Sequence, residues 1–262
     1  MIQFVSIQMA SPDGESFDKR IQRANRILKD LYESGVRPAQ ILFPEIWATG
    51  FFSFDQYILQ AEPVRGPIYE MMSEWSRRFG AYIHTGSFVE KDGEDYYNTS
   101  LLLDPHGDII GRYRKIHLFG YQSKETALLT PGTEAIVVKT DYGMAGMATC
   151  YDLRFPELFR TMVDLEAEYT LVASAWPMAR LGHWQLFNRV RALENQCFLI
   201  SCNGAGVQHG TTLAGHSSIV DPNGQLIKAG KESEEILIAD IDPKHLHSCR
   251  TDFPVLKDRK RL

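Results

Sequence analysis

Three residues with complementary reactive groups each come at the end of a predicted β-strand. They are Glu45, Lys115 and Cys150. A carboxylate can take the proton of a thiol, the thiolate can attack a carbonyl or nitrile carbon, and an ammonium group can stabilise the charge that develops. The sequence leaves other interpretations open: Glu45 could pair with a surface arginine, Lys115 could be solvated, and Cys150 could pack as a small hydrophobic residue.

Cys150 lies at a predicted strand-to-turn-to-helix junction. The segment 142–149 before it is small and apolar, while Pro156 and Glu157 after it are typical of the first turn of a helix. The positive end of a helix dipole favours a thiolate over a thiol. This position therefore predicts a Cys150 whose pKa is lowered.

The elements that must position these groups alternate between helices and strands. Apolar residues at helical spacing predict helices over 16–33, 68–79 and 182–195, and a further helix beginning at Pro156. Short apolar or alternating runs predict strands over 4–9, 40–44, 82–89, 97–103, 109–114, 135–140, 144–149, 169–174, 197–202, 217–220, 226–228 and 236–241. Charged turns such as KDGED join some strands as hairpins. This pattern favours a layered α/β fold with mixed sheets over a (β/α)8 barrel, whose alternation is strict.

Composition and charge exclude several other classes of protein. The 262 residues suffice for one large domain, so we expect a single domain over 1–262. A net charge of −5 offers no footprint for nucleic acid, and the basic C-terminal KDRKRL is interpreted as a solvated tail. We expect a cytoplasmic protein without membrane attachment, because no signal peptide, long apolar segment or CxxC motif is present.

Three motifs carry a family resemblance. The motifs FPE at 43–45, YRKIHL at 113–118 and CYDLRFPE at 150–157 resemble, in the same order, the signature blocks of the nitrilase (carbon–nitrogen hydrolase) superfamily. The resemblance implies a four-layer α-β-β-α sandwich of the nitrilase type with mixed sheets. It also implies a small amide substrate, no metal or other cofactor, and a homodimer or larger homo-oligomer.

The resemblance implies a role for each residue that matches the motifs. Glu45 would be the general base, Lys115 the oxyanion stabiliser and Cys150 the nucleophile that forms a thioester. The backbone N–H of Tyr151 would be a second oxyanion donor. Glu125 matches a further glutamate of the family, although an exposed loop charge is the alternative.

The substrate is less well specified than the chemistry. CYDLRFPELFR, with HW at 183–184 and RALENQ at 191–196, most resembles the ω-amidase branch. That branch acts on monoamides of dicarboxylic acids such as 2-oxoglutaramate. Phe51 stands where the family often has tyrosine, which puts the substrate assignment in doubt. Hydrolysis of N-carbamoyl amines or amino acids, and a catalytically idle binding module of the same fold, are the alternatives.

Three residues are candidates for substrate binding. Arg154 could hold a substrate carboxylate through its planar guanidinium, or it could form an ion pair with Asp152 or Glu157. Arg180 is a second candidate for the same role. Trp176 is interpreted as a pocket wall, with ordinary core packing as the alternative.

Overall fold

Two six-stranded mixed sheets form the centre of the protein. The structure is a computed structural model and describes residues 1–260. The first sheet has the order β14-β1-β2-β3-β4-β5, in which β1, β2 and β3 run parallel and the other pairs are antiparallel. Its strands are β1 (Ile2–Gln8), β2 (Gln40–Leu42), β3 (Tyr82–Asp92), β4 (Asp95–Leu103), β5 (Ile109–Arg114) and β14 (Glu235–Ile241).

The second sheet repeats this mixed pattern. Its order is β13-β12-β9-β8-β7-β6, with β7, β8 and β9 parallel at its centre. Its strands are β6 (Val137–Thr140), β7 (Gly143–Thr149), β8 (Tyr169–Ser174), β9 (Phe198–Asn203), β12 (Ser218–Val220) and β13 (Leu226–Ala229). The short strands β10 (Val207–Gln208) and β11 (Thr211–Thr212) form a separate hairpin.

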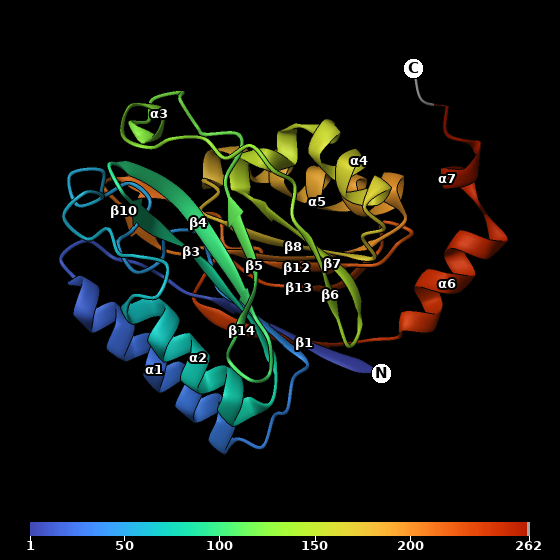
Figure 1. Cartoon of the computed structure of the whole chain (residues 1–262), viewed down its shortest axis with the longest axis horizontal. Coiled ribbons are helices and arrows are strands. Elements are labelled where there is room, and N and C mark those ends of the chain that lie inside the picture. Colours follow the sequence, from blue (N-terminus) through green and yellow to red (C-terminus); the bar gives the residue numbers. More distant parts are fainter. Residues whose placement is uncertain (261–262) are drawn as a thin grey trace.

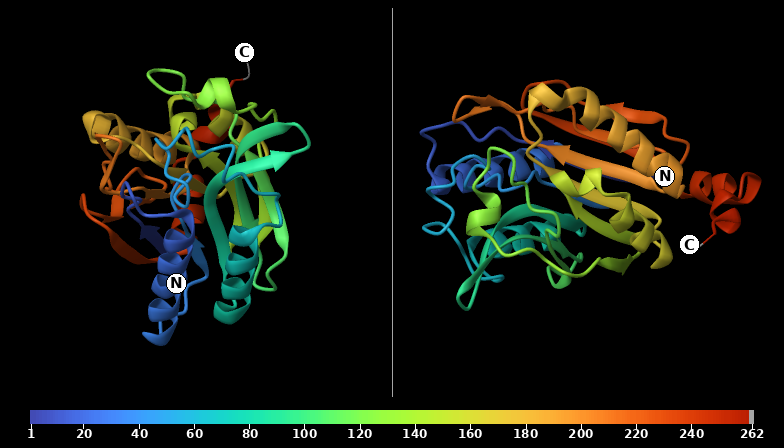
Figure 2. Two further views of the ribbon diagram at one scale, coloured as in Figure 1. Left: turned by 90° about the vertical axis from the view of Figure 1, so that its left-hand side faces the viewer. Right: turned by 90° about the horizontal axis from the view of Figure 1, so that it is seen from above.

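Helices cover the outer face of each sheet. Helices α1 (Phe17–Glu33) and α2 (Pro67–Phe79) pack on the first sheet, and α4 (Pro156–Asp164) and α5 (Leu181–Asn195) pack on the second (Figure 1). The expected four-layer α-β-β-α sandwich is therefore confirmed. Helices α6 (Pro243–Asp252) and α7 (Val255–Asp258) project from one end of these layers (Figure 2). None of the helices in residues 1–260 is long and apolar enough to cross a bilayer.

Local sequence signals explain where the main helices begin and end. The Ser16 hydroxyl accepts a hydrogen bond from the Lys19 N–H and caps α1. Gly80 ends α2 in the left-handed conformation with φ 61°, which glycine adopts without a steric cost. Between the sheets, Phe4 of β1 stacks on Tyr169 of β8 with ring centroids 5.6 Å apart. Aromatic packing of this kind joins the two sheets into one core.

Several parts of the chain differ from the sequence prediction, and one of them is the hairpin of β10 and β11, which was not predicted. The long connection after β5 contains the short helix α3 (Glu125–Leu128), which carries a candidate site residue. Helices α6 and α7 were not predicted, because their mixed polar sequence has weak helical periodicity. In the basic tail, Arg259 pairs with Asp164, while positions 261–262 lie outside the described residues.

Glu62 is a buried carboxyl that forms no ion pair with a cation of residues 1–260. One of its oxygens accepts the N–H of Ile68 at 3.2 Å, and the other has no hydrogen-bond partner in the described part of the chain. Burial raises the pKa of Glu62 to about 7. The folded state therefore binds this proton more tightly than the unfolded state does, and the stabilisation disappears as pH rises from the unfolded pKa through about 7.

We expect Glu62→Gln to flatten the dependence of stability on pH. Between pH 5 and pH 8 the wild type should lose about 2 kcal/mol of unfolding free energy that the variant keeps. Urea unfolding of both proteins at the two pH values measures this difference. Glu74→Gln, at an exposed position of helix α2, which follows Glu62 in the chain, is the control and should behave like the wild type. Identical pH dependence in all three proteins would contradict the assignment.

Candidate active site

The structure brings the carboxylate and the ammonium group into direct contact. Glu45 follows β2 and Lys115 follows β5, and their Oε1 and Nζ atoms lie 2.8 Å apart. The other Glu45 oxygen accepts the backbone N–H of Ala175, just after β8 of the second sheet, at 2.9 Å. Both charged side chains have 0% exposure. The surface pairing of Glu45 and the solvated Lys115 considered from the sequence are therefore excluded.

Glu125 is a second carboxylate on the same ammonium group. Its two oxygens lie 3.0 and 2.9 Å from Lys115 Nζ, and the Phe119 N–H donates to it at 2.7 Å. Glu125 has 0% exposure, so the exposed loop charge is excluded. Burial raises the pKa of Glu125, the positive charge of Lys115 opposes this, and the charge of Glu45 adds to it.

Lys115 keeps its charge although it is fully buried. Burial alone lowers its pKa, but the charges of Glu125 and Glu45 outweigh burial and raise the pKa of Lys115 above its ordinary value. A buried ammonium held between two carboxylates is a fixed positive charge and a fixed set of donors. The arrangement can stabilise negative charge on a bound substrate.

Asn98 is a site residue that the sequence analysis missed. It lies on β4, and its Nδ2 donates to Glu45 Oε1 at 2.9 Å and to Glu125 Oε1 at 2.8 Å. Its backbone carbonyl accepts the Lys115 N–H at 2.9 Å. The available signal was a polar residue next to the apolar half of a strand, in YYNTSLLL, which by itself does not distinguish a site residue from a core one.

Cys150 occupies a sharp turn after β7. It has φ 46°, an unusual conformation for a residue with a side chain, and it begins a 3₁₀ turn over Cys150–Arg154. Thr149 and Asp152 cap this turn reciprocally, and the Thr149 N–H donates to Asp152 Oδ2 at 2.8 Å. Backbone strain of this kind is common where a side chain must be presented to a ligand.

The predicted lowering of the Cys150 pKa is wrong in direction. Burial and then the charge of Glu45 raise the pKa of Cys150, and Lys115 opposes them only in part. The helix α4 begins at Pro156, beyond the 3₁₀ turn, so the thiol does not lie in the first turn of an α-helix, where the dipole acts. The resting side chain is therefore a thiol, and a nearby base is needed to ionise it.

The two signature motifs that contain Lys115 and Cys150 are joined through Asp152. Its Oδ2 accepts the Tyr113 hydroxyl at 2.6 Å, and its Oδ1 accepts the His117 backbone N–H at 3.1 Å. The His117 ring lies 2.8 Å from the same oxygen and stacks on Phe155 with ring centroids 3.8 Å apart. His117 therefore has a structural role, since its backbone and its ring both contact Asp152.

An aromatic pocket encloses the Cys150 side. Its lining residues are Phe51, Phe52, Phe119, Cys150, Tyr151, Arg154, Ala175, Trp176, Pro177 and Arg180. The cavity measures about 20 Å³, which is room for about one water molecule. Side chains at the mouth must therefore move when a substrate enters. Trp176 forms a wall of this pocket, as predicted, while its indole N–H donates to the Arg180 carbonyl at 2.8 Å.

Two arginines of this pocket have no acidic partner among residues 1–260. The Arg154 guanidinium lies 4.9 Å from the Trp176 ring and hydrogen-bonds His183 Nδ1 at 3.2 Å. Arg180 lies over the rings of Phe119 and Tyr121. Within residues 1–260 neither guanidinium forms an ion pair with a carboxylate. The pairing of Arg154 with Asp152 or Glu157 considered from the sequence is therefore not found.

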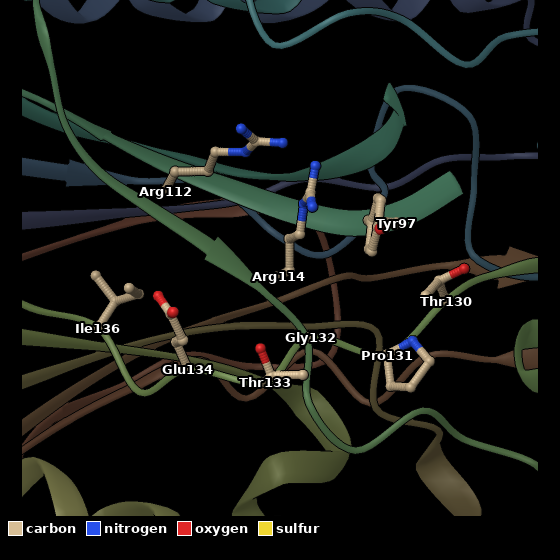
Figure 3. Close-up of a pocket in the computed structure, with 9 residues that line it drawn as sticks. All are labelled: Tyr97, Arg112, Arg114, Thr130, Pro131, Gly132, Thr133, Glu134 and Ile136. Atoms are coloured by element: carbon tan, nitrogen blue, oxygen red, sulfur yellow. The ribbon is translucent and has the colours of Figure 1, made fainter. Parts of the chain in front are cut away.

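A larger hollow of about 410 Å³ lies elsewhere and lacks reactive groups. Figure 3 shows Tyr97, Arg112 and Arg114 along one side of it and the segment 130–136 along the other. Arg112 and Arg114 pair with Glu90 and Asp92, and the Arg114 guanidinium stacks 3.5 Å from the Tyr97 ring. Its two arginines are thus already paired with carboxylates of the protein. The pocket that contains Cys150 is the better candidate for an active site.

Comparisons with known proteins identify the family of this chain. The chain matches the carbon–nitrogen hydrolase family over residues 6–251. It is 37% identical to a 2-oxoglutaramate amidase of Paenarthrobacter nicotinovorans, over 99% of this chain and 90% of the relative. It is 31% identical to an omega-amidase of Danio rerio, over 91% of this chain and 88% of the relative.

The fold agrees as well. The crystal structure of Nit3 of Saccharomyces cerevisiae, a member of the nitrilase superfamily, superposes with a TM-score of 0.90 at 29% identity, covering 99% of this chain and 97% of that one. A protein of Xanthomonas campestris from the same superfamily superposes with a TM-score of 0.91 at 26% identity, covering 100% of this chain and 98% of that one. The chain therefore belongs to the carbon–nitrogen hydrolase family and is an amidase of the nitrilase superfamily.

Proposed function

We propose that this amidase hydrolyses the terminal amide of a small dicarboxylic acid monoamide, such as 2-oxoglutaramate, and releases ammonia. The observation that carries the proposal concerns Arg154 and Arg180 in the pocket that contains Cys150, neither of which pairs with a carboxylate in the described part of the chain. Such a substrate has an amide at one end and a carboxylate at the other. A planar guanidinium binds a carboxylate through two parallel hydrogen bonds, so either arginine can hold the charged end away from the thiol.

In the first half of the reaction, Glu45 takes the proton of the Cys150 thiol as the sulfur attacks the amide carbon. The raised pKa of Cys150 supports this coupling, because a free thiolate is disfavoured until a base accepts the proton. The oxygen of the tetrahedral intermediate lies against Lys115 Nζ and the backbone N–H of Tyr151. Glu45 then returns the proton to the leaving nitrogen, the C–N bond breaks, and a thioester and ammonia result.

In the second half, water replaces ammonia. Glu45 takes a proton from the water molecule as its oxygen attacks the thioester carbon, and the same donors hold the second oxyanion. The C–S bond breaks and the sulfur leaves with the proton from Glu45. The products are a dicarboxylic acid and the free thiol, and the base is restored.

The named relatives support the same substrate class, since a 2-oxoglutaramate amidase and an omega-amidase both cover most of this chain. Ammonia release from a panel of ω-amides, simple amides, N-carbamoyl compounds and nitriles tests the proposal. We expect the ω-amides to be the best substrates by kcat/KM. Preference for N-carbamoyl compounds would instead support carbamoylase activity, and no turnover of any compound would support a binding module.

We expect Arg154→Met to weaken selection of the acidic substrate. For succinamate, kcat/KM should fall at least about thirtyfold, or 2 kcal/mol, because the substrate carboxylate loses its charged partner. For butyramide, which is neutral and of similar length, the loss should be small. Arg180→Met, measured in the same way, shows which guanidinium holds the carboxylate.

Arg189→Met is the matched control. Arg189 is an exposed arginine whose guanidinium donates to the Gly224 carbonyl and does not line the pocket that contains Cys150. The Arg189→Met variant should leave the ratio of kcat/KM for succinamate to kcat/KM for butyramide unchanged. Equal losses on succinamate and butyramide in the Arg154 variant, with a lowered Tm, would make Arg154 part of the scaffold and leave the proposed specificity without its anchor.

A further inference from the structure

We propose that Asn98 is a positioning residue for the reaction, whose carboxamide cross-links the two buried carboxylates and keeps Glu45 available as a base. The inference rests on the proposed role of Glu45. Two carboxylates and one ammonium group meet here, and Glu45, Glu125 and Lys115 are each fully buried. With both carboxylates ionised, the single ammonium group leaves the cluster with one net negative charge.

The contacts of Asn98 are unusually symmetrical. Its Nδ2 lies 2.9 Å from Glu45 Oε1 and 2.8 Å from Glu125 Oε1. Lys115 Nζ lies 2.8 and 3.0 Å from the same two oxygens. Each of these oxygens therefore accepts from one amide and from one ammonium group. The amide and the ammonium bridge the same two oxygens, and together the four groups form a closed ring.

The orientation of the carboxamide is determined by these contacts. The reverse orientation would place its carbonyl oxygen against two carboxylates, which can offer it no hydrogen in their ionised form. In the observed orientation, Oδ1 is buried and has no hydrogen-bond partner in the described part of the chain. A buried carbonyl without a partner opposes folding. The favourable contribution of this side chain must therefore come from its two N–H groups.

These N–H groups act on the proton affinity of the carboxylates. Two carboxylates buried in one site tend to share a proton, because burial and the repulsion between like charges both favour the neutral form. The pKa of Glu125 is raised for these reasons. A proton held on Glu45 would prevent it from accepting the proton of Cys150. Each hydrogen bond donated to a carboxylate favours its charged form, and Asn98 donates one to each.

Asn98 also fixes where the ammonium group lies. Its backbone carbonyl accepts the backbone N–H of Lys115 at 2.9 Å, and the backbone carbonyl of Lys115 in turn accepts the backbone N–H of Gly132 at 2.9 Å. The main chain of Asn98 thus aligns Lys115, and its side chain aligns the two partners of Lys115. A substitution at this position removes the side-chain bridge and leaves the main-chain contact in place.

The test is Asn98→Asp, which keeps the shape of the side chain, replaces the N–H₂ donor by an oxygen and so places a third carboxyl group beside Glu45 and Glu125. We expect kcat for an ω-amide to fall at least about a hundredfold, the scale of lost general-base catalysis, with KM changed by less than about threefold. The acidic limb of the pH profile of kcat/KM should move upward by about one pH unit, since Glu45 then holds a proton more tightly. Asn98→Ala and Asn98→Ser remove two donors and one donor without adding an acid. Both variants should lower kcat and move the acidic limb of the pH profile upward, as Asn98→Asp does, but by less, and the loss of kcat should be smallest for serine.

Thr99→Val is the matched control. Thr99 is the next residue on β4, is equally buried, and donates to Glu90 at 2.6 Å, outside the site. Its loss should lower Tm and leave the pH profile unchanged. Asn98 variants that behave in the same way, with unchanged pH profiles, would show a merely structural role and overturn the proposal. So would a raised KM with normal kcat.

A second readout does not depend on the substrate. The rate at which iodoacetamide alkylates Cys150 should rise with pH in the wild type, and the midpoint of that rise should lie higher in the Asn98 variants. The measurement remains informative if no ω-amide is turned over, and it therefore separates failure of this inference from failure of the proposed function. If Asn98→Asp does not fold, the alanine and serine variants decide the result, and an unchanged midpoint in both would overturn the inference.

Discussion

Replacement of Cys150 by alanine should abolish amide turnover while the fold remains intact. The thiol is the reacting atom of the proposed mechanism, and no other cysteine lines the pocket. Removal of a catalytic nucleophile lowers kcat by about 10⁴-fold or more in comparable enzymes. Cys150→Ser should be nearly as inactive, because Glu45 would then have to ionise a hydroxyl, which is a weaker acid than a thiol. Steady-state ammonia release and Tm measure the two effects separately.

The covalent intermediate provides an independent measurement. Rapid quenching of the wild type with substrate, followed by peptide mass spectrometry, should find the acyl group on Cys150. Cys249→Ser is the control, because Cys249 is a buried thiol that lies on α6, away from the pocket. It should retain turnover and the same adduct. An adduct on Cys197, Cys202 or Cys249 would contradict the assignment of the nucleophile.

Lys115→Met should lower kcat by about a hundredfold to a thousandfold, since it removes a preorganised donor from the developing oxyanion. The variant should also lose stability, because Glu45 and Glu125 would remain buried together without a cation. Loss of one partner from a buried ion pair costs about 3–5 kcal/mol. Activity at saturating substrate and urea unfolding test the two parts of the prediction.

Glu45→Gln separates catalysis from stability at the same contact. Glutamine keeps the shape of the side chain and has one oxygen that can still accept from Lys115 and Asn98, but it cannot take the proton of the thiol. We expect a comparable loss of kcat with a smaller loss of stability, because the change leaves one carboxylate for one ammonium group.

Lys115→Met with near-normal turnover would make Lys115 structural. A Glu45→Gln variant whose kcat stays within a few fold of the wild-type value would show that Glu45 is not the base.

The sequence by itself determined the elements and the reactive groups. The predicted strands 109–114 and 169–174 coincide with β5 and β8, and the predicted end of one helix at Gly80 is its observed cap. These elements can be predicted because apolar periodicity, capping residues and turn residues act within a few positions of one another. The motifs around Glu45, Lys115 and Cys150 could be recognised for the same reason, since each is a short local pattern.

The state of Cys150 was decided only by the tertiary structure. Local sequence predicted a helix N-terminus and a lowered pKa, but the pKa is raised by burial and by Glu45, which comes from the other sheet. Electrostatic effects on a buried group depend on every charge packed around it. A pattern limited to the neighbours of Cys150 along the chain contains none of that information.

The partners of Asn98 and Arg154 were likewise decided by packing. Asn98 meets Glu45 and Glu125 only because β2, β4 and α3 converge at one end of the first sheet. Arg154 is free of Asp152 because Tyr113 and His117 already occupy the Asp152 oxygens. Which polar groups pair depends on sheet order and register, and these are set by the burial of the whole chain rather than by the residues that pair.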